Sequence, residues 1–287
     1  MILKINMIKL RYFLILCIFF VGFISSNEDI KKLVLPKGFV ISIYADELIL
    51  PRQIAESESG YVFVGSKTRR SDNGKIIALI DRNNDGYAEE KIIVAEGLDF
   101  PTGVSINNGD LYFSEINKIW KIKNIESWLG SSKLELPKRE LVTDNLPSDT
   151  WHGYKYIDFG PDNNIYVSVG APCNVCTDPQ KKDNRLGAIH RYSNGELTTI
   201  AEGVRNSVGF DWSPKNKKLY FTDNGRDWLG DNSPSCELNV VNKEGSFYGF
   251  PYKHAKNVID PEFGALIPSI KKDFVDPIAE LGPQCST

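Results

Sequence analysis

The sequence repeats one strand pattern at a nearly constant interval, and this repeat limits the fold more than any other feature. Three segments share a plan of an alternating strand, a turn rich in Pro, Asp, Asn and Gly, and a second strand. They are centred on Tyr112, Tyr166 and Tyr220, which are 54 residues apart both times. A weaker copy places Phe63 in the tyrosine position, 49 residues before Tyr112. A regular period of this length indicates stacked supersecondary units, whereas a β-sandwich shows none.

Each repeat supplies about four strands. In the first copy, GKIIALIDRNNDGYAEEKIIVAEGL adds two more strands to the pair around Phe63. Amphipathic helical periodicity is nearly absent, so we predict an all-β fold, a β-propeller of four-stranded blades. Four units occupy about residues 50–256, and GFVISIYAD (38–46) is a candidate closing strand. The chain then forms either a four-bladed ring or part of a larger one.

The first 26 residues differ from the rest of the chain. Lys4, Lys9 and Arg11 precede an apolar run over residues 12–24, which ends abruptly at a polar segment. This pattern predicts a secretory signal peptide over residues 1–26, with an uncleaved anchor as the alternative, and one propeller domain over residues 27–287. We therefore expect a periplasmic or secreted protein with no later membrane span.

The number of cysteines is consistent with a periplasmic or secreted protein, and the net charge limits the partners it can bind. Removing the leader takes three of the 34 basic residues and leaves 31 against 37 acidic ones, a net charge of −6, which argues against nucleic acid or anionic lipid as partners. The exported part holds Cys173, Cys176, Cys236 and Cys285, which allow three connectivities. The CNVC segment could be a redox dithiol or half of a zinc site, but we favour a local structural disulfide.

Three histidines are the candidates for acid–base chemistry. His190 lies in an alternating strand and is expected to be a blade residue, and the setting of His254, in a loop, is ambiguous. His152 follows Trp151 in the connection that leads into a blade, where loops and inner strands meet the central channel. A histidine there can act as a general base, with a structural hydrogen bond as the equal alternative.

The next two connections carry further polar residues. GVRNSVGFDW places Arg205 and Asn206 at the corresponding position one blade later, where they could bind a carboxylate or a quinone oxygen or form a surface salt bridge. The loop over residues 222–241 offers either calcium ligands or a solvated acidic loop, through Asp223, Asp227, Asp231 and Glu237. The DRNNDG segment is expected to be an ordinary turn, because Ile92 stands where an EF-hand needs a glutamate.

These motifs resemble a known family. The segments WHGYKYIDFGPDNNIYVSVGAPCNVC, GVRNSVGFDW, TDNGRDWLGD, GSFYGFPYKH and DPEFG are similar to the pyrroloquinoline quinone (PQQ)-dependent sugar dehydrogenases of the sorbosone and aldose dehydrogenase type. The resemblance runs from about Leu35 to Gly282. It implies a six-bladed propeller with PQQ and calcium on the top face, of which about four blades and part of a fifth are present here.

The resemblance also implies roles for individual residues. His152 takes the hydroxyl proton while a hydride passes from the sugar carbon to the quinone. Arg205 stabilises the charge that develops on the quinone oxygen, and Asn206 positions the ring. The family then passes electrons to an acceptor such as a cytochrome c.

The calcium ion of the family is held by backbone carbonyls, and Gly225 and Arg226 match those positions. Asp227 and Glu237 are weaker candidates, for the surroundings of the ion. Family members continue past the LGP motif, whereas this chain reads LGPQCST and ends, so we expect a fragment of a longer protein or a degraded copy.

Two other functions are compatible with a propeller. One is a binding module without chemistry, since fold alone does not determine function. The other is a metal-dependent lactonase of the gluconolactonase type, which needs carboxylates at the channel centre instead of the pair formed by Arg205 and Asn206.

Overall fold

The structure is a computed structural model that describes residues 30–131, 135–176 and 182–283. The chain divides into two units, of which the first consists of Met1–Asp46 with Asn83–Tyr87 and the second of the remainder.

In the first unit, residues 38–46 contain no strand, and Val40 is 96% exposed. The expected closing strand is therefore wrong, because a strand requires a hydrogen-bonded neighbour and none pairs with this segment in the described residues. In the DRNNDG segment the predicted turn is present, with the Asp85 N–H donating to Asn83 Oδ1 at 2.8 Å.

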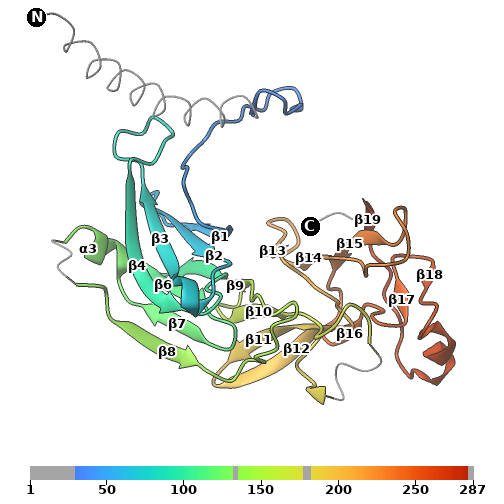
Figure 1. The fold of residues 1–287 in the computed structure, drawn as a ribbon. Helices are drawn as coiled ribbons and strands as arrows, with labels where there is room; N and C mark the ends of the chain where they lie inside the picture. Colours follow the sequence, from blue (N-terminus) through green and yellow to red (C-terminus); the bar gives the residue numbers. More distant parts are fainter. Residues whose placement is uncertain (1–29, 132–134, 177–181, 284–287) are drawn as a thin grey trace, which may run out of the picture. The chain divides into compact units, whose positions relative to one another are not determined.

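The second unit consists mainly of four antiparallel sheets that follow one another in sequence order (Figure 1). The first sheet contains β1 (Pro51–Glu56), β2 (Val62–Ser66), β3 (Gly74–Ile80) and β4 (Glu90–Leu98). The second contains β5 (Val104–Asn107), β6 (Asp110–Ser114), β7 (Ile119–Ile122) and β8 (Arg139–Thr143). The predicted all-β propeller of four-stranded blades is confirmed.

The other two blades each take a strand from later in the chain. The third contains β9 (Ile157–Phe159), β10 (Ile165–Val169), β11 (Ala188–Ser193) and β12 (Glu196–Glu202), with β16 (Ser246–Phe247) parallel to β12. The fourth contains β13 (Phe210–Trp212), β14 (Leu219–Asp223), β15 (Ser235–Val240) and β19 (Ala279–Pro283). The remaining elements are short: η1 (Arg70–Asp72), α3 (Ile125–Leu129), β17 (Lys253–His254), β18 (Val258–Ile259) and η2 (Gly264–Ser269). No described helix has the length and apolar character needed to cross a membrane.

The repeat reflects the blade structure. The four aromatic residues of the repeat lie in the second strand of each blade, Phe63 in β2, Tyr112 in β6, Tyr166 in β10 and Tyr220 in β14. The residues of the hairpin turns fix how the strands of a blade pair, as the turn between β5 and β6 shows. Asn108 and Gly109 join β5 to β6 with φ values of 52° and 78°, as the tightest hairpin turn requires, and only a few residue types adopt such angles easily.

The core lies between neighbouring blades. Phe63 of the first blade and Phe113 of the second share one apolar cluster and are fully buried. Ile119 and Ile157 belong to the cluster between the second and third blades, and Phe221 belongs to the one between the third and fourth. Because each sheet buries its face against the next, the blades stack and their first strands converge on one axis.

Candidate functional site

The site is formed where the connections into two blades meet the ends of the neighbouring strands. In an antiparallel pair, the residues before the first strand lie beside those that follow the second strand. His152 precedes β9 and Ala171 follows β10, while Arg205 and Asn206 precede β13 and Asn224 follows β14. Backbone hydrogen bonds join these segments, from the Ala171 N–H to the Arg205 carbonyl at 2.8 Å and from the Asn224 N–H to the Asn206 carbonyl at 3.2 Å. Thus His152, Arg205 and Asn206, which the sequence singled out, occupy one region.

His152 has the tautomer that a general base needs. Its Nδ1 lies 2.9 Å from the Ala171 carbonyl oxygen, which can only accept, so Nδ1 carries the proton and Nε2 keeps its lone pair. Burial, together with the positive charge of Arg205, lowers the pKa of His152 to about 4. The backbone φ of 49° is unusual for histidine, and such strain is concentrated at functional sites.

A glycine allows His152 and Asn206 to approach each other. A Cβ on Gly170 would lie 2.4 Å from the Cβ of His152 and 3.3 Å from Oδ1 of Asn206. The first distance is far below van der Waals contact, so position 170 has no room for a side chain. The absence of a side chain at Gly170 therefore leaves the space that His152 occupies, next to Asn206.

Arg205 is held rigidly although its side chain comes from a loop. The residue is 4% exposed, and its Nε and Nη2 donate to the carbonyl oxygen and to Oδ1 of Asn174, both at 2.8 Å. Nη1 donates to the Asn224 carbonyl at 3.2 Å, and Nη2 lies 3.3 Å from an Asp227 carboxylate oxygen. Burial lowers the pKa of Arg205, while the carboxylates of Asp223 and Asp227 oppose this, so the guanidinium remains charged.

Asp223 anchors the backbone of the two site residues. Its carboxylate oxygens accept hydrogen bonds from the N–H groups of Arg205 at 2.8 Å and Asn206 at 2.6 Å. Glu237 is its cross-strand partner in the register of β14 and β15. Burial raises the pKa of both carboxyl groups, and the neighbouring Asp223 charge raises that of Glu237 further. In the described residues, no three carboxylates of the acidic loop lie within 4.8 Å of one another.

The carbonyl oxygens of Gly225 and Arg226 are suitable for a calcium ion. In the described part of the chain, neither oxygen accepts a hydrogen bond, and calcium prefers such oxygens. The Arg226 side chain is anchored separately, with Nη1 donating to Asp260 at 2.6 Å. A cavity of about 10 Å³, about the smallest that can hold one water molecule, lies beside Gly225, and its lining includes Glu237 and His254 together with the cations Arg205 and Lys253. The two carbonyl oxygens are ligands of the kind that calcium binds, so Gly225 and Arg226 are the residues that fit the ion.

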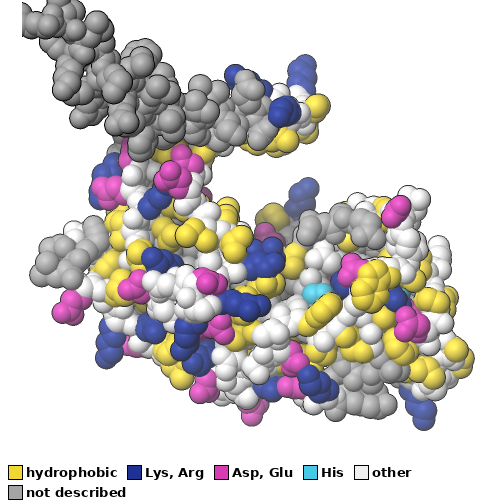
Figure 2. All heavy atoms as spheres, in the orientation of Figure 1, with side chains coloured by type: hydrophobic (Ala, Val, Ile, Leu, Met, Phe, Trp, Pro, Cys, Tyr) yellow, Lys and Arg dark blue, Asp and Glu magenta, His cyan; other side chains and the backbone are white. Residues whose placement is uncertain are grey.

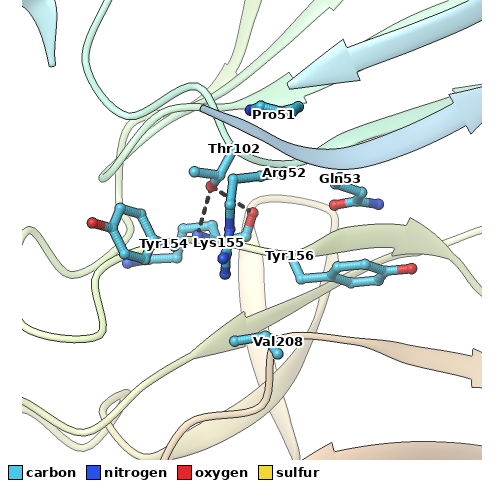
Figure 3. A pocket seen from close by; sticks show the side chains of 8 residues that line it. All are labelled: Pro51, Arg52, Gln53, Thr102, Tyr154, Lys155, Tyr156 and Val208. Atoms are coloured by element: carbon cyan, nitrogen blue, oxygen red, sulfur yellow. Dashed lines mark hydrogen bonds between the residues drawn. The ribbon is translucent and has the colours of Figure 1, made fainter. Parts of the chain in front are cut away.

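A larger cavity of about 300 Å³ lies where the inner strands converge (Figure 3). All four blades contribute to its lining, which consists of Pro51, Arg52, Gln53, Thr102, Tyr154, Lys155, Tyr156 and Val208. The Gln53 side chain bridges two blades, since its Nε2 donates to the Ile157 carbonyl at 2.7 Å. The lining contains the guanidinium of Arg52 and the amine of Lys155 but no carboxylate, and the Lys67 ammonium lies 5.0 Å from the Tyr154 ring centroid. On the face shown in Figure 2, Lys and Arg side chains are interspersed with Asp and Glu side chains. Arg52 is the permanent cation in the lining of this cavity.

Lys155 is an unusual component of this cavity. It is 1% exposed, and its Nζ donates to the Gly153 carbonyl at 2.6 Å. Burial lowers the pKa of Lys155 to about 7, and the charge of Asp149 opposes this effect. Folding therefore either buries a charged amine or removes its proton, and both cost free energy.

We expect the substitution Lys155→Met to stabilise the fold by about 2–4 kcal/mol at pH 7. Between the folded pKa of about 7 and the unfolded value of 10.5, the unfolded chain binds the extra proton, so wild-type stability rises with pH. The advantage of the variant should therefore shrink as pH approaches 10.5, which urea unfolding at pH 7 and pH 10 measures. The exposed control Lys215→Met should change neither value by more than about 0.5 kcal/mol. If Lys155→Met is less stable than wild type at pH 7, the buried amine of Lys155 does not destabilise the fold and its pKa is not lowered as stated.

The remaining candidate residues have structural positions. His190 is buried in β11 with its Nε2 2.7 Å from the Arg185 carbonyl, which confirms it as a blade residue. His254, ambiguous from sequence, lies 2.9 Å from Asp260 and lines the small cavity. The predicted local disulfide joins Cys173 to Cys176, while Cys285 and the expected leader lie outside the described residues.

Sequence reasoning missed Asn174 and Asp260. Their partners Arg205 and Arg226 are 31 and 34 residues away along the chain, and no local pattern indicates such pairings. The position of Asn174 between two cysteines was the only local signal.

The sequence matches a family model over residues 25–247, described as a domain of unknown function, DUF7133. A protein of Borreliella burgdorferi, described as uncharacterized, is 32% identical over 266 residues, which cover 90% of this chain and 66% of that protein. The chain thus spans just under two thirds of the length of this curated relative.

Several solved structures share the fold. The calcium structure of a Trichoderma reesei enzyme of carbohydrate-active enzyme family AA12 has a TM-score of 0.70 and 20% identity, over 87% of this chain and 72% of the other. The holo PQQ domain of Coprinopsis cinerea pyranose dehydrogenase has a TM-score of 0.64 and 15% identity, over 83% and 66%. The PQQ-bound aldose sugar dehydrogenase of Streptomyces coelicolor has a TM-score of 0.61 and 20% identity, over 85% and 71%. At these identities the likeness establishes the propeller fold.

Proposed function

This chain belongs to the DUF7133 family, and we propose that it forms the propeller of an exported oxidoreductase that oxidises a sugar or sugar aldehyde, with PQQ as hydride acceptor and calcium beside it. The observation that carries the proposal is the pairing of a neutral His152, whose Nε2 keeps its lone pair, with a charged and buried Arg205. The motif resemblance and the fold shared with PQQ-bound dehydrogenases support the same reading.

In this proposal His152 removes the proton of the reacting hydroxyl. Its Nδ1 is occupied by the Ala171 carbonyl, so Nε2 receives the proton. Burial and the Arg205 charge keep the imidazole neutral near pH 7, which keeps the base available. Proton removal leaves electron density on the substrate oxygen and makes loss of a hydride from the same carbon easier.

Arg205 and Asn206 supply electrostatic stabilisation and orientation. The guanidinium is held in place before any ligand binds, so it can stabilise developing negative charge without reorganising. Asp223 accepts hydrogen bonds from the backbone N–H groups of both residues and thereby fixes the positions of their Cα atoms.

Bound PQQ would supply the two-electron acceptor that no side chain provides. Arg205 and Asn206 are the residues proposed to hold it, through the charged guanidinium and the side-chain amide. The carbonyl oxygens of Gly225 and Arg226 would hold the calcium ion. Asp227 and Glu237 are the weaker candidates for the surroundings of the ion, and Glu237 would have to lose the proton that burial favours.

The alternatives differ in what the site must contain. A lactonase of the gluconolactonase type needs carboxylates at the channel centre, whereas the residues that line the inner cavity include none. A binding module without chemistry needs no general base and is an outcome of the test below. The Cys173–Cys176 disulfide supports the proposed export, since such bonds persist in oxidising compartments. A cytochrome c is the proposed electron acceptor.

We expect PQQ to raise the melting temperature of the full-length chain by about 5 °C at saturating concentration, and only when calcium is present, because a ligand that binds the folded state alone stabilises it. A thermal-shift titration with PQQ, with calcium or with EDTA, measures this. NAD⁺ is the control ligand and should cause no shift, since the chain has no dinucleotide fingerprint. A folded protein that shows no shift with PQQ and calcium would contradict the proposal and favour the binding module.

A further inference from the structure

A short loop closed by the Cys173–Cys176 disulfide lies against Arg205. The loop follows β10 of the third blade, whereas Arg205 leads into β13 of the fourth blade. Asn174 is the residue that joins them, and it is 7% exposed although it belongs to a loop. The proposed catalysis accounts for neither the disulfide nor this burial.

Asn174 uses both its backbone and its side chain to hold the site. Its carbonyl oxygen accepts from Arg205 Nε and its Oδ1 from Arg205 Nη2, both at 2.8 Å. Two hydrogen bonds along one edge fix the plane of a guanidinium as well as its position. The same Oδ1 accepts from the Asp227 N–H at 2.8 Å, and Nδ2 donates to the Asp227 carbonyl at 3.2 Å. One residue therefore ties together the arginine and the loop that carries Gly225 and Arg226.

The disulfide restricts the residue that makes these contacts. The two shortest hydrogen bonds of the Arg205 guanidinium both go to Asn174, and the longer ones go to Asn224 and Asp227. The edge formed by Nε and Nη2 is therefore oriented by the backbone and the side chain of Asn174 together. A bond between the residues on either side of the pair Asn174 and Val175 removes most of the freedom that an open loop would have. Ordering the loop in advance lowers the cost of ordering the arginine.

We infer that the disulfide-closed loop Cys173–Cys176 positions the Arg205 guanidinium through Asn174, and that activity at this site depends on the oxidised state of the two cysteines. Asn174 is thus a positioning residue. The consequence for catalysis rests on the proposed function, but the effect on Arg205 itself does not. Reduction by a dithiol reagent forms two protein thiols and converts the reagent to its disulfide, and it would free the loop.

The direct test follows the Arg205 Nε–H by NMR in the full-length, ¹⁵N-labelled chain. An Arg205→Lys sample identifies the signal. We expect its exchange with water to be at least about tenfold faster in the double variant Cys173→Ser/Cys176→Ser, because hydrogen-bonded protons exchange only after opening. Asn174→Ala keeps the backbone acceptor of Nε–H but removes the side-chain acceptor of Nη2 and the bonds to Asp227, so exchange should again be faster because the loop and the guanidinium open more often. Asn174→Asp should retain protection, because a carboxylate accepts the same Nη2–H hydrogen bond. The matched control is Asn164→Ala, which removes a side-chain amide that donates to Asp162 in another turn of the third blade.

A second arm uses wild-type protein, so that a poorly folding variant does not decide the outcome. Dithiothreitol should accelerate the Arg205 Nε–H exchange, and reoxidation should restore it. Unchanged exchange in Asn174→Ala and after confirmed reduction would overturn the inference.

Kinetics separate this inference from the proposed function. If wild type reduces a dye with PQQ, we expect Asn174→Ala to lower kcat about tenfold with little change in KM, because the arginine acts on charge that develops in the transition state. If Asn174→Ala has the same kcat as wild type, the inference that activity depends on this positioning is overturned. If wild type neither binds PQQ nor reduces the dye, the proposed function fails, and Nε–H exchange still decides the positioning role.

Discussion

Replacing His152 by asparagine is expected to lower kcat for PQQ-dependent dye reduction by about 10³-fold while PQQ binding persists. General bases typically contribute about 10²–10⁴-fold to a rate. Asparagine suits the test because it tolerates the φ of 49° and its side-chain amide can still donate to the Ala171 carbonyl. What it lacks is a basic nitrogen in place of Nε2. Steady-state kinetics with a sugar and a redox dye, alongside the PQQ thermal shift, measure the two effects separately.

The control for this prediction is Lys217→Asn, at an exposed turn residue with a φ of 59°, which should leave kcat unchanged. Equal losses of dye reduction and of PQQ binding in His152→Asn would assign His152 to the structure of the site instead of to proton transfer.

The same histidine sets an expected pH dependence. Since burial and the Arg205 charge lower the pKa of His152 to about 4, the acidic limb of kcat/KM should fall near pH 4 instead of near 6.5. The stability contributed by the neutral imidazole is complete above the unfolded pKa of 6.5 and is lost as pH falls towards 4. An acidic limb at 6.5 would show that the base is not His152 in this environment.

Removing the carboxylate of Asp260 is expected to destabilise the protein by about 3–5 kcal/mol. Its side chain is fully buried and accepts from Arg226 Nη1 at 2.6 Å and from His254 Nε2 at 2.9 Å. Its other oxygen accepts from the N–H groups of Glu262 and Phe263, both at 2.9 Å. Asp260→Ala leaves the Arg226 cation, which is 4% exposed, with Glu262 as its remaining acidic partner. Urea unfolding at pH 7 gives the free energy difference.

The exposed Asp273→Ala is the matched control and should change the free energy of unfolding by less than about 0.5 kcal/mol. Burial alone would raise the pKa of Asp260, but hydrogen bonds from His254 and Arg226 lower it overall. Its contribution to stability is therefore present above the unfolded pKa of 3.8 and is lost as pH falls through the lower folded value. A loss below about 1 kcal/mol in Asp260→Ala would mean that Arg226 finds a new partner or water.

The blades could be predicted because their signal is local. The hairpin from β5 to β6 requires alternating apolar residues on both sides of Asn108 and Gly109, and all of this lies within a few residues. Repetition of this pattern at Tyr112, Tyr166 and Tyr220 then indicated how many units stack. The segment 38–46 shows the limit of such reasoning, because it has strand composition but no partner in the described residues.

The residues that hold the site could not be predicted in the same way. His152, Arg205 and Asn206 were found because they precede blades at equivalent positions and match family motifs. Asn174 and Asp260 stand in loops with no periodic pattern, and their roles depend on arginines more than 30 residues away. Glu237 was identified as acidic, but its raised pKa comes from burial and from Asp223 across the sheet.

The sequence by itself determined the all-β class, the blade period and the connections that carry His152 and Arg205, because strand alternation, turn residues and repeat spacing are properties of neighbouring residues. Only the tertiary structure decided that the neutral His152 keeps its lone pair on Nε2, that Asn174 holds the Arg205 guanidinium, and that residues from separate blades line one inner cavity. These properties depend on burial and on contacts between separate blades. Such contacts are set by how the sheets stack, which no local stretch of the chain encodes.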